Sequence, residues 1–300
     1  MVSVIIPCHN CAGFIDRAIK SVMAQSYKDV EIILVENNST DNTLRVLQKY
    51  RSLYPQLISV LIEFTPGAPA ARNCGLKMAK GEWIQFLDAD DELLIDKIST
   101  QLNAAELAGA DVVAGASLLK YNTPKKSFDI ERQVDEDVWK GLITSNLGIT
   151  SSNLWRKDAL VEVGGWDERI SSSQEYDLLF RLIKKSAVVI VDHHLDTIVH
   201  FSQNSVSKST NKEKFEKIIG NRLKLRVAIK EELKAKGILS PQLNTAIDKY
   251  IYNELISNSD KIPEFCANYL KSQDLTVGLE TTIRIKAHHY LKRVRNALNI

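Results

Sequence analysis

The stretch WIQFLDADDE, residues 83–92, decides the fold prediction. Five mostly apolar residues run directly into three carboxylates, Asp88, Asp90 and Asp91. Like charges held close together make one another harder to ionise. A buried strand that ends in such a cluster therefore predicts that a positive charge is supplied there from elsewhere.

Strand-like and helix-like patterns alternate around this stretch. Short apolar runs predict strands, and amphipathic or Ala-rich segments between them predict helices; the strands cover 2–7, 31–36, 57–64 and 83–87, and the helices 14–23, 39–50 and 70–80. This alternation indicates βαβ units around a parallel sheet. Ligands bind at the carboxyl ends of the strands of such sheets. Pro7 and the segments 36–38 and 88–90 all fall at these ends.

The pattern is less regular after residue 95. It predicts a helix over 96–108, one strand over 111–119, a polar loop over 122–136, a helix over 174–185 and a strand over 187–192. From about residue 205 the chain reads as helices alone.

The composition is that of a globular protein without a membrane span. The 300 residues are 44% hydrophobic and 25% charged, and no apolar run approaches the roughly 20 residues that a membrane helix needs. The start of the chain lacks the basic region of a signal peptide, so we expect a cytoplasmic protein. Cys8 and Cys11 have CxxC spacing but no second pair, which favours buried thiols over a zinc site.

The charge is distributed unevenly along the chain. Residues 1–200 carry 21 Lys and Arg against 27 Asp and Glu, a net of −6, whereas residues 201–300 carry 18 against 10, a net of +8. Within this basic part, residues 283–298 combine apolar residues at helical spacing with five Lys and Arg side chains. The segment fits a peripheral helix on an anionic membrane or a helix packed on its own protein. No nucleic-acid-binding motif is present, so no nucleic acid partner is expected.

Four segments, taken in order, resemble one enzyme family. VSVIIPCHN, EIILVENNSTDNT, AARNCGLKMAKGEWIQFLDADD and GGWDERISSSQEYDLLFRL resemble the family 2 glycosyltransferases of GT-A fold, over residues 2–205. The resemblance implies a Rossmann-like, mostly parallel α/β sheet sandwiched by helices in a domain of residues 1–205. Residues 1–100 would bind the nucleotide sugar and residues 101–205 the acceptor. Residues 206–300 would form a helical C-terminal extension.

The resemblance also implies a reaction and a set of site residues. A single sugar would pass, with inversion, from a nucleotide-sugar donor to a glycan or lipid-linked acceptor, as in cell-surface polysaccharide synthesis, with Mg²⁺ or Mn²⁺ stabilising the departing diphosphate. The metal ligands would be Asp90 and His200. The donor would be bound by Asp88, Arg72, Pro7, Glu36 and Asn37.

Two departures from the family pattern affect the site. The family usually has Glu-Asp where this chain has Gln174-Glu175, which makes Glu175 the expected general base. Asp177, on the acceptor side, is expected to be a structural ion or a helix cap, with the role of base as its alternative. Many relatives carry Asp where this chain has Glu36 and Asn37. Uridine is the first choice of nucleobase, and guanosine and thymidine remain open because Asn both accepts and donates hydrogen bonds.

The acceptor side and the function class each leave an alternative. Trp155 and Trp166 could stack on sugar faces or pack in the core. A non-catalytic nucleotide-sugar-binding protein would have the same donor pocket. A metal-dependent nucleotidyltransferase would also use carboxylates and a metal, but it normally has a Gly-rich phosphate loop, and PCHNCAGF at 7–14 is a poor one.

Overall fold

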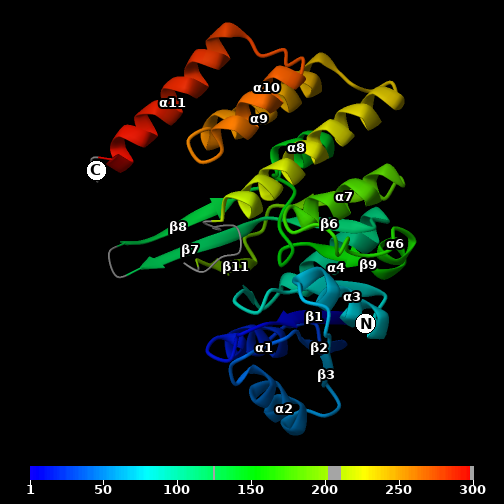
Figure 1. The fold of residues 1–300 in the computed structure, drawn as a ribbon. Coiled ribbons are helices and arrows are strands. Elements are labelled where there is room, and N and C mark those ends of the chain that lie inside the picture. The colour runs from blue at the N-terminus through cyan, green and yellow to red at the C-terminus, as the bar shows by residue number, and fades with distance from the viewer. Residues whose placement is uncertain (124–125, 202–210, 298–300) are drawn as a thin grey trace. The chain divides into compact units, whose positions relative to one another are not determined.

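The computed structural model describes residues 1–123, 126–201 and 211–297 (Figure 1). The chain divides into two compact units, Met1–Gln203 and Asn204–Ile300. The first unit contains all the strands that the described residues form, and the second contains helices.

The main sheet of the first unit has seven strands among the described residues, in the order β10-β6-β9-β4-β1-β2-β3. Their bounds are β1 Val2–Cys8, β2 Val30–Glu36, β3 Ile58–Ile62, β4 Trp83–Phe86, β6 Val112–Gly115, β9 Leu154–Arg156 and β10 Val189–Asp192. All neighbours pair in parallel except β9, which runs antiparallel to both β4 and β6. The expected α/β architecture with a mostly parallel sheet is confirmed.

Helices cover both faces of this sheet, which explains why its strands are continuous apolar runs. On one face, Val4 and Ile6 of β1 belong to a core with residues of α1, α2 and α4. On the other face, Ile5 lies so close to Gly75 of α3 that a Cβ there would come within 2.4 Å of Ile5 Cγ2. The helices of this unit are α1 Ile15–Met23, α2 Thr43–Leu53, α3 Ala68–Met78, α4 Lys97–Ala108, α5 Val138–Thr144, α6 Lys157–Glu162 and α7 Gln174–Lys184.

A second, four-stranded sheet among the described residues corrects two predictions. It has the order β5-β11-β7-β8, with β5 Glu92–Leu93, β7 Ser117–Thr123, β8 Lys126–Arg132 and β11 Thr197–His200. The single strand expected over 111–119 is wrong, because the chain leaves the main sheet after β6 and enters the second sheet with β7. The polar loop expected over 122–136 is also wrong, because β8 pairs antiparallel with β7.

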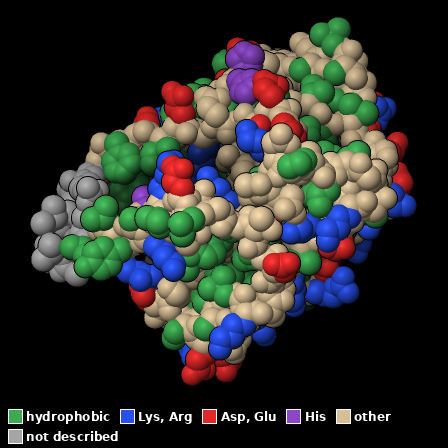
Figure 2. Space-filling view, turned by 90° about the horizontal axis from the view of Figure 1, so that it is seen from above, with side chains coloured by type: hydrophobic (Ala, Val, Ile, Leu, Met, Phe, Trp, Pro, Cys, Tyr) green, Lys and Arg blue, Asp and Glu red, His purple; other side chains and the backbone are tan. Residues whose placement is uncertain are grey.

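The second unit consists of four helices among its described residues: α8 Lys212–Ala235, α9 Pro241–Asn258, α10 Pro263–Ser272 and α11 Leu279–Ala297. The helical C-terminal extension is therefore confirmed. Over the described parts of both units, none of the helices combines the length and the apolar character that crossing a bilayer would require. Figure 2 shows Lys and Arg side chains interspersed with acidic and hydrophobic ones at the surface.

Candidate active site

Three neighbouring parallel strands end at one edge of the main sheet. The segments that follow β1 and β2 are joined there, because Asn37 N donates to Cys8 O at 2.8 Å and the His9 ring lies 2.8 Å from Asn37 O. The carboxylates of the 83–92 stretch follow β4, the strand on the other side of β1. The topology thus brings the predicted donor-binding segments to one place.

Buried hydrogen bonds hold the carboxylate cluster in shape. Ser151 Oγ accepts from Asp88 N at 3.0 Å and donates to Asp91 Oδ2 at 2.6 Å. The backbone of His200 makes a further hydrogen bond to the Asp91 carboxyl. Burial, with the charge of Asp88 added, raises the pKa of Asp91 well above its usual value. Asp91 is therefore the buried carboxylate through which the cluster is bonded to the protein interior.

Asp90 is the carboxylate that best fits a bound cation. It is only half-buried, and burial together with the charge of Asp88 raises its pKa. Arg17 donates to the Asp90 carbonyl rather than to its carboxylate. A divalent cation would relieve this excess of negative charge, and carboxylate oxygens suit Mg²⁺ or Mn²⁺.

The protein alone does not complete a metal coordination sphere in the part of the chain that the structure describes. No three His, Cys, Asp or Glu side chains gather there in a metal-binding group. Cations at phosphate sites commonly use one or two carboxylates and take the other ligands from phosphate and water. The residues present fit that arrangement.

His200 lies beside the cluster, but its ring contacts another carboxylate. Its Nε2 is 3.6 Å from Glu92 Oε1, and burial, with Arg17 nearby, lowers the pKa of the imidazole. The neutral imidazole is therefore favoured, which is the form that ligates metals. The role of His200 as a metal ligand remains a prediction.

Arg72 connects the carboxylate cluster to the helix that carries the expected base. This buried side chain ion-pairs with Asp88 Oδ1 at 2.7 Å and donates to Gln174 Oε1 at 3.1 Å. Its guanidinium lies 4.5 Å from the centre of the Trp166 ring. A planar fork with several donors suits these simultaneous contacts, which a lysine would not reproduce.

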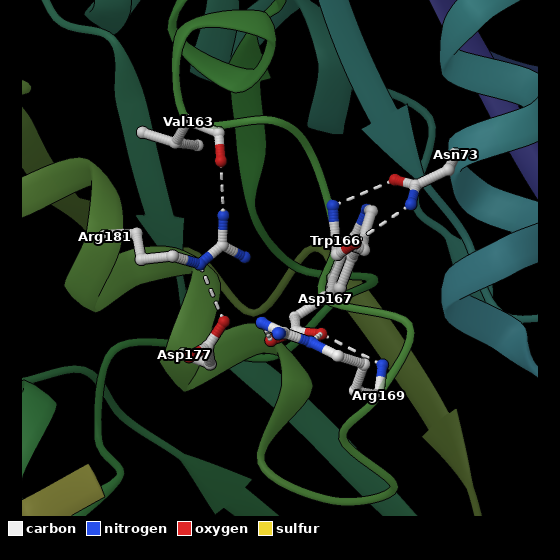
Figure 3. Close-up of polar contacts among 7 residues, drawn as sticks. All are labelled: Asn73, Val163, Trp166, Asp167, Arg169, Asp177 and Arg181. Carbon is white, nitrogen blue, oxygen red and sulfur yellow. Dashed lines mark hydrogen bonds and ion pairs between the residues drawn. The ribbon is translucent and has the colours of Figure 1, made fainter.

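Glu175 is the second residue of α7, directly after Gln174. The structure therefore brings the residue expected to act as base next to the one that Arg72 contacts. Asp177 is occupied differently: its carboxylate ion-pairs with Arg181 Nε at 2.8 Å, and Arg181 also donates to Val163 O at 2.8 Å (Figure 3). These contacts favour a structural role for Asp177.

Of the two alternatives for Trp155 and Trp166, the structure supports packing in the core, and their placement on the acceptor side is wrong. Trp155 is 0% exposed and Trp166 is 2% exposed, so neither presents a ring face to a sugar. Trp155 is buried because β9 is inserted between β4 and β6 in the middle of the sheet. Trp166 is clamped to α3 by Asn73, whose amide accepts from Trp166 N at 2.8 Å and donates to Trp166 O at 2.9 Å (Figure 3).

The segment expected to bind the nucleobase, residues 36–38, is held in place by hydrogen bonds to backbone groups of the protein. Glu36 Oε1 accepts from Ser39 N at 2.6 Å. Asn37 Nδ2 donates to two carbonyls of the 63–65 segment at 2.8 Å, and its Oδ1 accepts from Gly67 N at 2.8 Å. The Asn37 amide therefore makes these hydrogen bonds to backbone groups of the protein itself. Pro7, half-buried in β1, lies beside Val35 in the register.

Three buried residues linked by hydrogen bonds, Lys97, Gln85 and Ser151, form what we call the buried polar chain, which reaches the carboxylate cluster through Ser151. Lys97, at the start of α4, donates to Gln85 Oε1, and Gln85 Nε2 donates to Ser151 O at 2.9 Å. Sequence patterns alone indicated no specific role for Ser151, Gln174 or Lys97. The one local signal was the run of polar residues at 150–153, all of which are buried in the structure.

Comparisons with known proteins identify the family of the chain. The model of the family described as "Glycosyl transferase family 2" matches residues 3–160. The chain is 40% identical over 106 residues to an Escherichia coli enzyme, the UDP-Glc:alpha-D-GlcNAc-diphosphoundecaprenol beta-1,3-glucosyltransferase WfaP; this match covers 35% of the chain and 41% of that enzyme. It is 29% identical to the uncharacterized glycosyltransferase RT0329 of Rickettsia typhi, over 98% of the chain and 97% of the relative.

Solved structures confirm the GT-A fold. The S. aureus TarS 1-349 complex with UDP-GlcNAc superposes with a TM-score of 0.61 at 16% identity, covering 97% of this chain and 92% of that chain. The mannosyltransferase PcManGT of Pyrobaculum calidifontis, in complex with GDP-Man and Mn²⁺, gives a TM-score of 0.60 at 16% identity, over 99% and 87% of the two chains.

Proposed function

This chain belongs to glycosyl transferase family 2, and we propose that it transfers a single sugar, with inversion, from a UDP-sugar to a hydroxyl of a lipid-linked glycan. The observation that carries the proposal is the cluster at the end of β4, where Asp90 has a raised pKa and Arg72 reaches from Asp88 to the helix of Glu175. The family membership sets aside the nucleotidyltransferase alternative.

The donor would lie along the edge where β1, β2 and β4 end. Pro7 and the 36–38 segment would line the nucleobase pocket, and Asp88 and Arg72 would face the ribose and the sugar. Asp90, with His200 as a second candidate ligand, would hold Mg²⁺ or Mn²⁺, which supplies positive charge where the leaving diphosphate becomes more negative.

Glu175 would act as the general base. The acceptor oxygen attacks the anomeric carbon on the face opposite the diphosphate and gives its proton to the Glu175 carboxylate. The new carbon–oxygen bond forms as the bond to the diphosphate oxygen breaks, and that oxygen keeps the electron pair. Attack from the opposite face inverts the anomeric configuration.

A lipid-linked acceptor is favoured by the relatives whose names state one. WfaP and a Campylobacter jejuni relative, the GalNAc(5)-diNAcBac-PP-undecaprenol beta-1,3-glucosyltransferase, both have acceptors on an undecaprenol diphosphate according to their names. Each match covers about two fifths of the relative, so we carry over the class of acceptor but not the sugar. Such an acceptor would place the enzyme at the cytoplasmic face of a membrane.

Nucleotide binding tests the donor site. We expect calorimetry with UDP, GDP and dTDP to show that UDP binds most tightly, and that its binding weakens sharply without Mn²⁺ and is lost in Asp90→Ala. Asp158→Ala removes an exposed carboxylate on α6 and should bind as wild type does. A folded protein that binds none of the three nucleotides would refute the proposal.

A second variant separates catalysis from binding. Glu175→Gln keeps the size of the side chain but removes the base, so transfer should fall by at least about 100-fold while nucleotide binding is retained. Asp177→Asn should keep most of the activity, because that carboxylate is engaged by Arg181. Undiminished transfer in Glu175→Gln would show that another group is the base. Nucleotide binding without transfer by the wild type, assayed with sugars of the preferred nucleotide and a range of acceptors, would favour a non-catalytic binding protein.

A further inference from the structure

Helix α11 is attached to its neighbour α9 through a stripe of residues along one face. Ile285 is buried, His289 Nε2 lies 2.9 Å from Asn253 Oδ1, and Arg293 donates to Ile256 O at 3.0 Å. Both of these partners belong to α9. Residues 285, 289 and 293 are spaced by four, so they form one stripe along the helix.

The opposite face of α11 is apolar and exposed. The exposed fractions are 77% for Leu279, 59% for Ile283, 65% for Tyr290 and 57% for Leu291. At about 100° per residue these side chains, with Ala287 among them, span an arc of roughly 120° whose centre lies nearly opposite Ile285 and His289. We call residues 279, 283, 287, 290 and 291 the apolar stripe. Packing on α9 does not explain it.

Basic side chains border the apolar stripe. Arg284 lies at one edge of the arc and Lys286 at the other. Glu280 lies within the arc and forms an exposed ion pair with Arg284 at 2.7 Å. Residues 201–300 carry a net charge of +8.

We infer that α11 is a membrane-docking helix that lays its apolar stripe into the interface of an anionic lipid bilayer. A helix that lies in the interface needs an apolar face, Lys and Arg beside it, and a modest overall hydrophobicity, and α11 combines these features. The negative surface of the membrane attracts the flanking cations before the apolar side chains insert. The other face, fixed to α9 by Asn253 and Ile256, remains attached to the protein.

The docking geometry does not depend on the transferase proposal, although its purpose does. A lipid-linked acceptor never leaves the bilayer, so an enzyme held at the surface meets it in two dimensions rather than three. The mode of attachment is peripheral and reversible, because one amphipathic helix inserts only to the level of the headgroups.

Co-sedimentation of the full chain with vesicles tests the inference. The probes are vesicles of phosphatidylcholine alone and of phosphatidylcholine with 30 mol% phosphatidylglycerol. We expect the wild type to bind the anionic vesicles at least about 10-fold more strongly, and this preference to shrink in high salt. Ile283→Asn/Leu291→Asn and Arg284→Glu/Lys286→Glu should each reduce binding by about 10-fold or more. Leu107→Asn, at an exposed residue of α4, and Lys49→Glu/Arg51→Glu, on α2, are the matched controls and should bind as wild type does.

Three results would overturn the inference. The first is a wild type that binds neither kind of vesicle. The second is equal vesicle binding by the wild type and by Ile283→Asn/Leu291→Asn. The third is a wild-type dimer, seen by light scattering without vesicle binding, that dissociates in that variant, since the stripe would then be a self-association face.

Thermal unfolding and UDP calorimetry on the same variants keep the two proposals separate. Unchanged unfolding midpoints establish that the α11 variants fold. Vesicle binding without nucleotide binding would refute the donor-site proposal and leave α11 as a docking helix. Nucleotide binding without vesicle binding would refute the docking role of α11 and leave the donor-site proposal in place.

Discussion

Lys97 offers a quantitative test of the buried polar chain beneath the carboxylate cluster. The side chain is fully buried and donates to Gln85, which in turn donates to Ser151. Burial lowers the pKa of Lys97 to about 7, although Asp192 and Asp196 oppose the shift. In the unfolded chain the pKa returns to about 10.4.

The direction of the pH dependence follows from these two values. Between pH 7 and about pH 10 the unfolded chain holds a proton on Lys97 that the folded protein has largely lost. The free energy of unfolding therefore rises with pH across this window, and below pH 7 the contribution is constant at its least favourable value. Integrated from pH 7 to pH 9, with each proton worth about 1.4 kcal/mol per pH unit, the gain is about 2 kcal/mol.

Lys97→Met should abolish this gain. The variant leaves the buried Gln85 Oε1 without its donor, so its absolute stability also changes, by about 1–3 kcal/mol. The informative quantity is therefore the change in the free energy of unfolding between pH 7 and pH 9, compared between the variant and the wild type. Groups that titrate alike in both proteins cancel in this comparison. Urea unfolding at pH 7, 8 and 9 measures it.

The control is Lys49→Met, which removes an exposed lysine from α2 and should keep the wild-type slope. If Lys97→Met gains as much stability between pH 7 and pH 9 as the wild type does, Lys97 is not the titrating group. The buried polar chain would then carry a charged lysine, contrary to the reasoning above.

Three further substitutions test contacts in and around the site. Ser151→Ala removes a buried hydroxyl that serves two members of the carboxylate cluster, so thermal unfolding should show a loss of about 2–3 kcal/mol; Ser52→Ala, on the exposed side of α2, should stay within about 0.5 kcal/mol, and equal effects would contradict the assignment. Arg72→Lys keeps the charge but loses the planar guanidinium, which contacts Asp88 and Gln174 and lies over the Trp166 ring. Denaturant unfolding should show a loss of about 1–2 kcal/mol in the free energy of unfolding, and an unchanged midpoint would mean that the charge alone matters. Gly75→Ala places a methyl group 2.4 Å from a β1 side chain and should cost about 1–3 kcal/mol, whereas Gly13→Ala meets no atom within 4 Å and should cost little, so similar midpoints would argue against close packing of α3 on the sheet.

The main sheet and the place of the site could be predicted because both follow from local patterns. Strands buried on both faces are apolar throughout, and parallel strands bring their carboxyl ends to one edge. That is why the sequence alone placed Asp88 near Pro7 and residues 36–38. Asn38, the last residue of that segment, has φ of +58°, a left-handed backbone conformation that Asn tolerates.

The second sheet and the supporting contacts could not be predicted because they depend on distant parts of the chain. In β8 only Phe128 and Ile130 alternate with polar residues, and both remain exposed, so no apolar run marks the strand. Ser151 contacts Asp91 across 60 positions, and Gln174 contacts Arg72 across 102. Nothing in the local sequence of either residue specifies its partner.

Two consecutive residues of α3, Arg72 and Asn73, contact the two segments that precede Glu175, the expected base, in the chain. Arg72 contacts Gln174 at the start of α7, and Asn73 clamps the backbone of Trp166 in the preceding turn. The adjoining Gly165 has no room for a side chain, since a Cβ would lie 2.6 Å from the Asn73 amide oxygen. The segment of residues 164–185 is thus not an independent module: a chimaera that takes it from a relative should also take that relative's residues for positions 72 and 73.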